Sequence, residues 1–221
     1  GTYDNETHAT IRNNTFSGNS GYSLSFCDGT IESNTISANS GGGLSRCNGV
    51  IRNNIISDNL NQGLAHCDGP IHNNIISRNT GAGLSSCDGV IENNVIARNA
   101  RGPNPSSGLY NCDGTIVNNI IYLNSGNYGG GLRDCHGTIE NNTIVYNWAY
   151  REGGGLYHCS SVRNCIIWGN TAPSGPQLFM CGADYSSIQE WQGAGVGNIS
   201  APPYFVDRLA ENYHLHTWSA C

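Results

Sequence analysis

The sequence predicts an all-β fold, a right-handed single-stranded parallel β-helix of about eight coils. The first observation behind this prediction is a series of cysteines, in which Cys27, Cys47, Cys67 and Cys87 lie 20 residues apart. The series continues at spacings of 25, 23, 24 and 22 residues, through Cys112, Cys135, Cys159 and Cys181. Such a period is typical of a solenoid, because a unit of 20–25 residues buries its apolar face only against its neighbours.

The second observation is that three apolar columns run through the repeat. Each apolar residue is flanked by polar or small residues and followed within a few positions by Gly, Asn or Asp, which is typical of a short strand with a corner after it. Coils stacked about 4.8 Å apart would pair each strand with its copies above and below. The columns are Leu24, Leu44, Leu64, Leu84, Leu109, Leu132, Leu156 and Leu178; Ile11, Ile31, Ile51, Ile71, Ile91, Ile116, Ile139 and Val162; and Phe16, Ile36, Ile56, Ile76, Ile96, Ile121, Ile144 and Ile167.

Two columns of asparagine support the same register. Asn tolerates left-handed backbone angles at a tight corner, and stacked amides hydrogen-bond along the axis, so both columns are expected to be structural ladders. The columns are Asn14, Asn34, Asn54, Asn74, Asn94, Asn119 and Asn142, and Asn19, Asn39, Asn59, Asn79, Asn99, Asn124, Asn147 and Asn170.

Length and composition predict one domain, with coils over residues 1–181 and an irregular capping segment over residues 182–221. Charged residues make up only 12% and Met occurs once, so helix formers are scarce. All ten basic residues are Arg and the formal net charge is −6, so no basic stripe is available for nucleic acid. No apolar run approaches the roughly 20 residues that span a bilayer, so membrane insertion is not expected.

The repeated motif I-x-N-N-x-I carries a resemblance to a known group of proteins. With a tail that includes NCIIWGN at residues 164–170 and PYFVD at residues 203–207, the chain resembles right-handed parallel β-helix repeat proteins, which include secreted and surface proteins of environmental bacteria and pectate-lyase-like solenoids. The resemblance implies a fold and a secreted or cell-surface location. In this group, pectin lyases need clustered acids with Ca²⁺ and a basic residue, and related hydrolases need grouped Asp residues with a Gly-His-Gly turn. The chain has no Lys, and the only segment that approaches a Gly-His-Gly turn consists of Cys135, His136 and Gly137. Catalysis is therefore not indicated.

The cysteine column leaves two interpretations open, and a third, a ladder of metal sites, is disfavoured because thiolates in a straight row do not form tetrahedral sites by themselves. Ten cysteines in one repeated context fit an oxidising, extracellular compartment better than a zinc site. Neighbouring Cα atoms about 4.8 Å apart lie within the range of a disulfide, so the eight column cysteines can pair as four bridges. Cys165 and Cys221 would then pair with each other or with another chain. Alternatively, the column consists of reduced, inward thiols that act as small apolar fillers.

An acid or amide follows most column cysteines and precedes Gly: Asp28, Asn48, Asp68, Asp88 and Asp113. Each is expected to hydrogen-bond the backbone of its own Asp-Gly turn. Stacked carboxylates also make Asp68, Asp88 and Asp113 weak candidates for Ca²⁺, and no other cofactor is predicted. His66 and His158 precede column cysteines and are interpreted as surface residues without a partner.

The corner loops lengthen in the second half of the chain. Five residues lead from the second asparagine column to the next Leu in the first four coils, and eight to ten do so from residue 99 on. Per-coil insertions usually map to a binding face, and exposed aromatic residues suit sugar rings or a protein partner. Equally, these residues can pack on one another or cover strand edges. The candidates are Arg101, Tyr110, Tyr128, Trp148, Tyr150, Arg151, Glu152 and Tyr157.

Three functional hypotheses follow. The first is an extracellular structural or adhesive protein that associates head to tail into filaments, because the first coil begins at Ile11 with no evident cap. The second is a polysaccharide-binding or polysaccharide-cleaving β-helix that acts through the long-loop edge. The third is a passive segment of a larger surface protein, suggested by the abrupt end at Ser219, Ala220 and Cys221.

Overall fold

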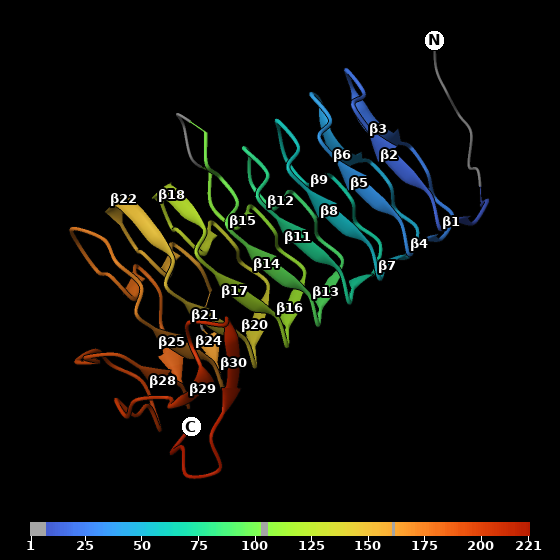
Figure 1. Cartoon of the computed structure of the whole chain (residues 1–221). Coiled ribbons are helices and arrows are strands. Elements are labelled where there is room, and N and C mark those ends of the chain that lie inside the picture. Colours follow the sequence, from blue (N-terminus) through green and yellow to red (C-terminus); the bar gives the residue numbers. More distant parts are fainter. Residues whose placement is uncertain (1–7, 103–105, 161) are drawn as a thin grey trace.

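The computed structural model describes residues 8–102, 106–160 and 162–221, and its coils stack in sequence order as a right-handed parallel β-helix (Figure 1). The first sheet holds β1 (Ile11–Arg12), β4 (Ile31–Glu32), β7 (Ile51–Arg52), β10 (Ile71–His72), β13 (Val90–Glu92), β16 (Thr115–Val117), β20 (Thr138–Glu140), β24 (Val162–Arg163) and β27 (Ala183–Asp184). The second holds β2 (Thr15–Ser17), β5 (Thr35–Ser37), β8 (Ile55–Ser57), β11 (Ile75–Ser77), β14 (Val95–Ala97), β17 (Ile120–Tyr122), β21 (Thr143–Val145), β25 (Ile166–Trp168) and β28 (Ser187–Ile188). The third holds β3 (Tyr22–Ser25), β6 (Gly42–Ser45), β9 (Leu64–Ala65), β12 (Leu84–Ser85), β15 (Leu109–Tyr110), β19 (Leu132–Arg133), β23 (Leu156–Tyr157) and β26 (Leu178–Phe179). Two further pairs are the parallel β18 (Ser125–Tyr128) and β22 (Trp148–Glu152), and the antiparallel β29 (Phe205–Asp207) and β30 (Asn212–Leu215).

The predicted apolar columns are in register and form the core. Ile31 pairs with Ile51 in the first sheet, and Leu44 pairs with Leu64 in the third. All four side chains are fully buried, within one cluster that runs along the rod. The predicted all-β solenoid of about eight coils is therefore confirmed. Within the described residues, no helix is long and apolar enough to cross a membrane.

Each coil turns at three corners, and one residue at each corner has a left-handed backbone. In the third coil, φ is 57° at Asn53 and 53° at His66. The residue that follows, Asn54 or Cys67, is buried inside the solenoid. We expected the ladder asparagines to adopt the left-handed angle themselves. The preceding residue adopts it instead, and the next side chain then points inward, where it meets its copy in the adjacent coil.

The asparagine ladders connect successive coils through both backbone and side chain. The backbone N–H of Asn54 donates to Oδ1 of Asn74 at 2.9 Å, and Nδ2 of Asn54 donates to the same oxygen at 3.0 Å and to the carbonyl of Ile31 at 2.9 Å. The second ladder repeats this pattern, for example from Asn59 to Asn79. The predicted asparagine stacking is confirmed. Each ladder residue satisfies buried polar groups that would otherwise cost about 1–3 kcal/mol apiece.

The first ladder continues beyond its last asparagine with other residue types. The N–H of Asn142 donates to Sγ of Cys165 at 3.3 Å, and the N–H of Cys165 donates to Oγ of Ser186 at 3.1 Å. Ser186 in turn donates to Oδ1 of Asn198 at 2.9 Å. Cys165 therefore occupies an asparagine position of the ladder.

The solenoid extends beyond residue 181, where we expected the irregular segment to begin. Strands β27 and β28 join the first and second sheets, and Trp191 packs against the end of the core. The β29–β30 hairpin lies against the second sheet (Figure 1), where Tyr213 packs with Tyr122 at 5.0 Å between ring centroids. The C-terminal end of the rod is thus partly covered by the chain's own residues, while Leu178 of the last leucine-column strand stays half-buried. At the opposite end, Phe16 and Leu24 of the first coil are only half-buried.

A column of glycines at the third corner makes the backbones of adjacent coils approach closely, and it gives a first prediction. A Cβ atom on Gly69 would overlap the carbonyl oxygens of Asn48 and Gly49, whereas one on Gly21 would meet no atom within 4 Å. Gly69→Ala is expected to lower the free energy of unfolding by about 2 kcal/mol or more, because the backbone must move. Gly21→Ala is the control and should change it by less than about 0.5 kcal/mol. Urea unfolding measures both, and equal effects would contradict the close approach.

The contact of the hairpin with the second sheet gives a pH prediction. The Tyr122 hydroxyl donates to Glu211 at 2.7 Å, and with the nearby Arg98 guanidinium it holds the pKa of Glu211 below its ordinary value. The ionised Glu211 carboxylate therefore stabilises the folded protein at pH values above the ordinary glutamate pKa of about 4.3. This stabilisation is lost as the pH falls through the lowered pKa of Glu211 in the folded protein. Because Arg98 and Glu211 are both partly solvated, we expect only about 0.5 kcal/mol.

Glu211→Gln should therefore be less stable than the wild type at pH 7, and the difference should shrink below pH 4. Chemical denaturation across this pH range provides the measurement. Glu190→Gln changes an exposed glutamate outside the hairpin and serves as the matched control. A difference that stays constant from pH 7 to pH 3 would contradict the assigned role of the carboxylate.

Candidate functional site

The side chains on the outward face of the third sheet change from small to large at the fifth coil. Because successive strand residues face opposite sides, the residue after each inward leucine of the leucine column points outward. In the first four coils these residues are Ser25, Ser45, Ala65 and Ser85. In the last four they are Tyr110, Arg133, Tyr157 and Phe179, which are neighbours in strand register. A row of large side chains thus lies along the second half of the rod.

Within this row, rings and a guanidinium group stack on one another. The guanidinium carbon of Arg133 lies 4.9 Å from the ring centroid of Tyr110. The rings of Tyr157 and Phe179 are stacked, with centroids 5.8 Å apart and an interplanar angle of 2°. These contacts fix the orientation of the side chains, so the row presents ordered aromatic surface.

The long loops add two side chains to this row. Strands β18 and β22, which the loops form, pair in parallel beside the third sheet (Figure 1). Tyr128 of β18 lies 4.9 Å from the ring of Tyr157. The guanidinium carbons of Arg133 and Arg151 lie 5.6 and 5.7 Å from the Tyr128 ring. We call Tyr110, Tyr128, Arg133, Arg151, Tyr157 and Phe179 the aromatic–arginine strip.

Other candidates on the long loops lie elsewhere. Trp148 and Tyr150 form a pair of their own on β22, with ring centroids 3.9 Å apart and 40% and 53% of their surfaces exposed. Glu152 is aligned with Tyr128 in the β18–β22 register. Arg101 is exposed, in a loop whose residues 103–105 lie outside the described residues. The loops therefore pack on one another and still leave aromatic surface in contact with solvent.

The lengthened loops do not predict two residues of the strip, Arg133 and Phe179. Both lie on regular strands of the third sheet, not in loops. Their signal in the sequence is the residue after the leucine column, which changes from Ser or Ala to large side chains after the fourth coil. Comparing outward columns, as well as loop lengths, would have found them.

The ten cysteines are free thiols in the structure. The interpretation as stacked inward thiols describes this state, in which neither the four bridges of the other interpretation nor a Cys165–Cys221 pair is formed. The cysteine column lies at the third corner of the coils, as the asparagine ladders lie at the other two. The N–H of Cys47 donates to Sγ of Cys67 at 3.5 Å. Sγ of Cys47 donates to the carbonyls of Ser45 and Leu24. Burial raises the pKa of Cys27 to about 11 and that of Cys165 to about 12, which keeps these thiols protonated and unreactive.

The acids after the column cysteines form a fourth ladder. The N–H of Asp88 donates to Oδ1 of Asp68 at 3.0 Å, and the N–H of Asp113 donates to Oδ1 of Asp88 at 2.9 Å. Each side chain thus accepts from the next coil and not, as expected, from its own turn, because stacking places that donor directly above it. One oxygen of each weak Ca²⁺ candidate is engaged in this way. The expectation for His158 is also corrected, because Nδ1 of His158 lies 2.9 Å from Oδ1 of Asp134.

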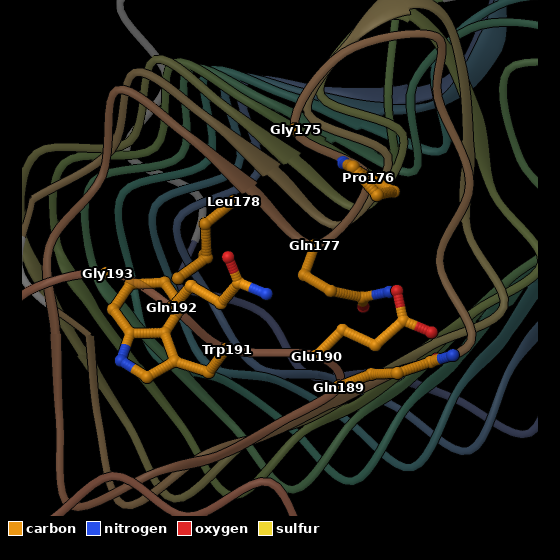
Figure 2. Close-up of a pocket in the computed structure, with 9 residues that line it drawn as sticks. All are labelled: Gly175, Pro176, Gln177, Leu178, Gln189, Glu190, Trp191, Gln192 and Gly193. Atoms are coloured by element: carbon orange, nitrogen blue, oxygen red, sulfur yellow. The ribbon is translucent and has the colours of Figure 1, made fainter.

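A cavity of about 280 Å³ opens at the C-terminal end of the rod (Figure 2). Figure 2 shows the side chains of Gln177, Gln189 and Glu190 on one side and those of Trp191 and Gln192 on the other. Gln177 exchanges hydrogen bonds with Asn170 of the second ladder, and Gln189 accepts from the N–H of Gly169. These amides close the solenoid, so the cavity belongs to the capping of the rod.

The state of the thiols gives a prediction that an aromatic disulfide reagent can test. In the native protein, Cys221 should react first because it is exposed, whereas Cys27 and Cys181 are half-buried and the others are buried. Cys221→Ser should remove this fast phase. In denaturant without reductant, ten thiols per chain should react. A lower total that rises to ten after reduction would show that the column is bridged in solution.

Comparison with known proteins agrees with this architecture. A family model described as a right-handed β-helix region matches residues 2–172, which is more than half of the chain. No curated protein and no solved structure gives a significant match. The in-register strands of adjacent coils, the asparagine ladders and this match confirm the resemblance to right-handed parallel β-helix proteins that the repeat predicted. The chain belongs to the right-handed β-helix family.

Proposed function

We propose that this protein is an adhesive β-helix that binds polysaccharide at or outside the cell surface through the aromatic–arginine strip. The observation that carries the proposal is the strip itself, an ordered run of rings and guanidinium groups over four adjacent coils. The fold is compatible with structural and with carbohydrate-related roles.

The chemistry of the strip suits sugars. Aromatic side chains offer apolar faces with few rotatable bonds, and the apolar face of a sugar ring can stack on them at a low cost in conformational entropy. Arginine offers up to five N–H donors in a planar fork, which can pair with hydroxyl or carboxylate oxygens. Arg133 and Arg151 lie against the same ring, that of Tyr128, so donors and stacking surface are adjacent.

The geometry of the rod suits a linear polymer. Outward side chains of adjacent coils repeat at the strand spacing of about 4.8 Å, so one binding element recurs along the axis. The fully buried leucines Leu109, Leu132 and Leu156 hold the strip from behind. A preorganised surface of this kind loses little freedom when it binds.

The proposal is tested by glycan-array binding followed by affinity measurement on the polysaccharide that binds. Tyr157→Ser introduces the residue that the same column carries at Ser85, so the fold should be retained. We expect a loss of about 2 kcal/mol, or roughly thirtyfold in affinity, from truncation of a central aromatic contact. Trp218→Ala, at a ring that is 67% exposed outside the strip, should leave affinity unchanged.

Failure to bind any plant, algal or bacterial polysaccharide, or equal losses in the two variants, would contradict the proposal. Release of reducing ends during the assay would instead support the polysaccharide-cleaving alternative. End-to-end self-association stays a prediction.

A further inference from the structure

Three side chains with metal-binding atoms meet at the third corner of the sixth and seventh coils. Asp134 and His136 lie on either side of Cys135, whose side chain is buried in the core. His158 occupies in the next coil the position that Asp134 holds, one residue before the column cysteine. Coil stacking therefore brings residues 24 positions apart in sequence to one place on the surface.

The ligand atoms of these residues are close enough to share one ion. One carboxylate oxygen of Asp134 and one ring nitrogen each of His136 and His158 lie within 4.8 Å of one another. The closest pair is Asp134 Oδ1 and His158 Nδ1, at 2.9 Å. Ligands about 2.0–2.1 Å from a tetrahedral ion are about 3.3 Å apart, so small side-chain rotations are sufficient to form the site.

The backbone holds the three residues in place before any ion binds. The N–H of His136 donates to Oδ1 of Asp113 at 2.7 Å, and its carbonyl accepts from Oγ of Ser160 at 2.7 Å. The N–H groups of Asp134 and His158 donate to carbonyls of the adjacent coil, at 3.0 and 2.9 Å. Such preorganisation lowers the entropic cost of assembling a metal site.

The surroundings orient the carboxylate. Nε of Arg133 donates to Oδ2 of Asp134 at 3.0 Å, which leaves Oδ1 directed toward His158. Metal-ligating carboxylates are commonly held by a hydrogen bond of this kind. The thiol of Cys135 is directed away from the cluster, because its Sγ donates to the carbonyl of Arg133 inside the coil. The ligand set is thus two imidazoles and one carboxylate.

We propose that Asp134, His136 and His158 form a surface binding site for a divalent first-row transition metal of the Zn²⁺ type. Two imidazole nitrogens favour Zn²⁺, Co²⁺, Ni²⁺ or Cu²⁺ over Ca²⁺ and Mg²⁺, which prefer oxygen ligands. The exposure of both histidines leaves the fourth position to water. The three ligands lie at the third corner and none of them belongs to the aromatic–arginine strip, although the strip residue Arg133 orients Asp134.

Titration of the untagged full chain with Zn²⁺ tests the site, in a Cys221→Ser background that removes the exposed thiol. We expect one ion per chain, and Co²⁺ should develop visible absorption bands that Zn²⁺ abolishes. His158→Asn and His136→Asn should each weaken binding at least about tenfold, the lower range for loss of a metal-site partner. Both variants should fold, because the same columns carry Asn111 and Asn48.

His66→Asn is the matched control, because His66 occupies the same column position and backbone conformation in the third coil as His158 does in the seventh. It should bind Zn²⁺ as the background protein does. Three outcomes would each overturn the proposal. Zn²⁺ binding could be equally weak in all three variants, it could be unaffected by His158→Asn and His136→Asn, or the background protein could fail to bind one ion per chain. Because the titration contains no polysaccharide, its outcome does not depend on the proposed function of the strip.

Discussion

The hydrogen bonds between ladder residues of adjacent coils are the interaction on which the rest of this structure depends. At each of the three corners of a coil, the residue after the turn is buried, and buried N–H and C=O groups without partners are costly. Asparagine meets this requirement because it carries both a donor and an acceptor. In Asn54, the N–H and Nδ2 both donate to Asn74 of the next coil. Each coil therefore supplies hydrogen-bond partners for the buried polar groups of its neighbour.

Cysteine carries out a related task at the third corner. Its sulfur accepts a backbone N–H from one coil and donates to carbonyls within and below its own, as Cys47 and Cys67 show. The equivalence is clearest at Cys165, which accepts from Asn142 in a ladder that is otherwise asparagine up to that coil. Sulfur is a weaker hydrogen-bonding group but adds apolar volume to the core. The cysteine column is thus structural without requiring a disulfide.

Because inward columns and corners hold the fold, outward positions are free to differ between coils. The third sheet uses this freedom after the fourth coil, where Ser and Ala give way to the aromatic–arginine strip. The third corner uses it in the sixth and seventh coils, where Asp134, His136 and His158 replace the residues of earlier repeats. In both places stacking converts a separation of more than twenty residues into direct contact. The regular first half supports the more varied second half.

The sequence alone determined the fold of this protein, because a repeat leaves a period, and the period places leucine, isoleucine and asparagine columns in register. It also located the long loops and most residues of the strip. The tertiary structure decided which side chains meet. Arg133 and Tyr128 are in contact because β19 lies beside the strand that the long loop forms, and Asp134 meets His158 across two coils. Such contacts depend on side-chain direction and on the bond partner chosen at each corner, and the spacing of residues along a chain does not specify either.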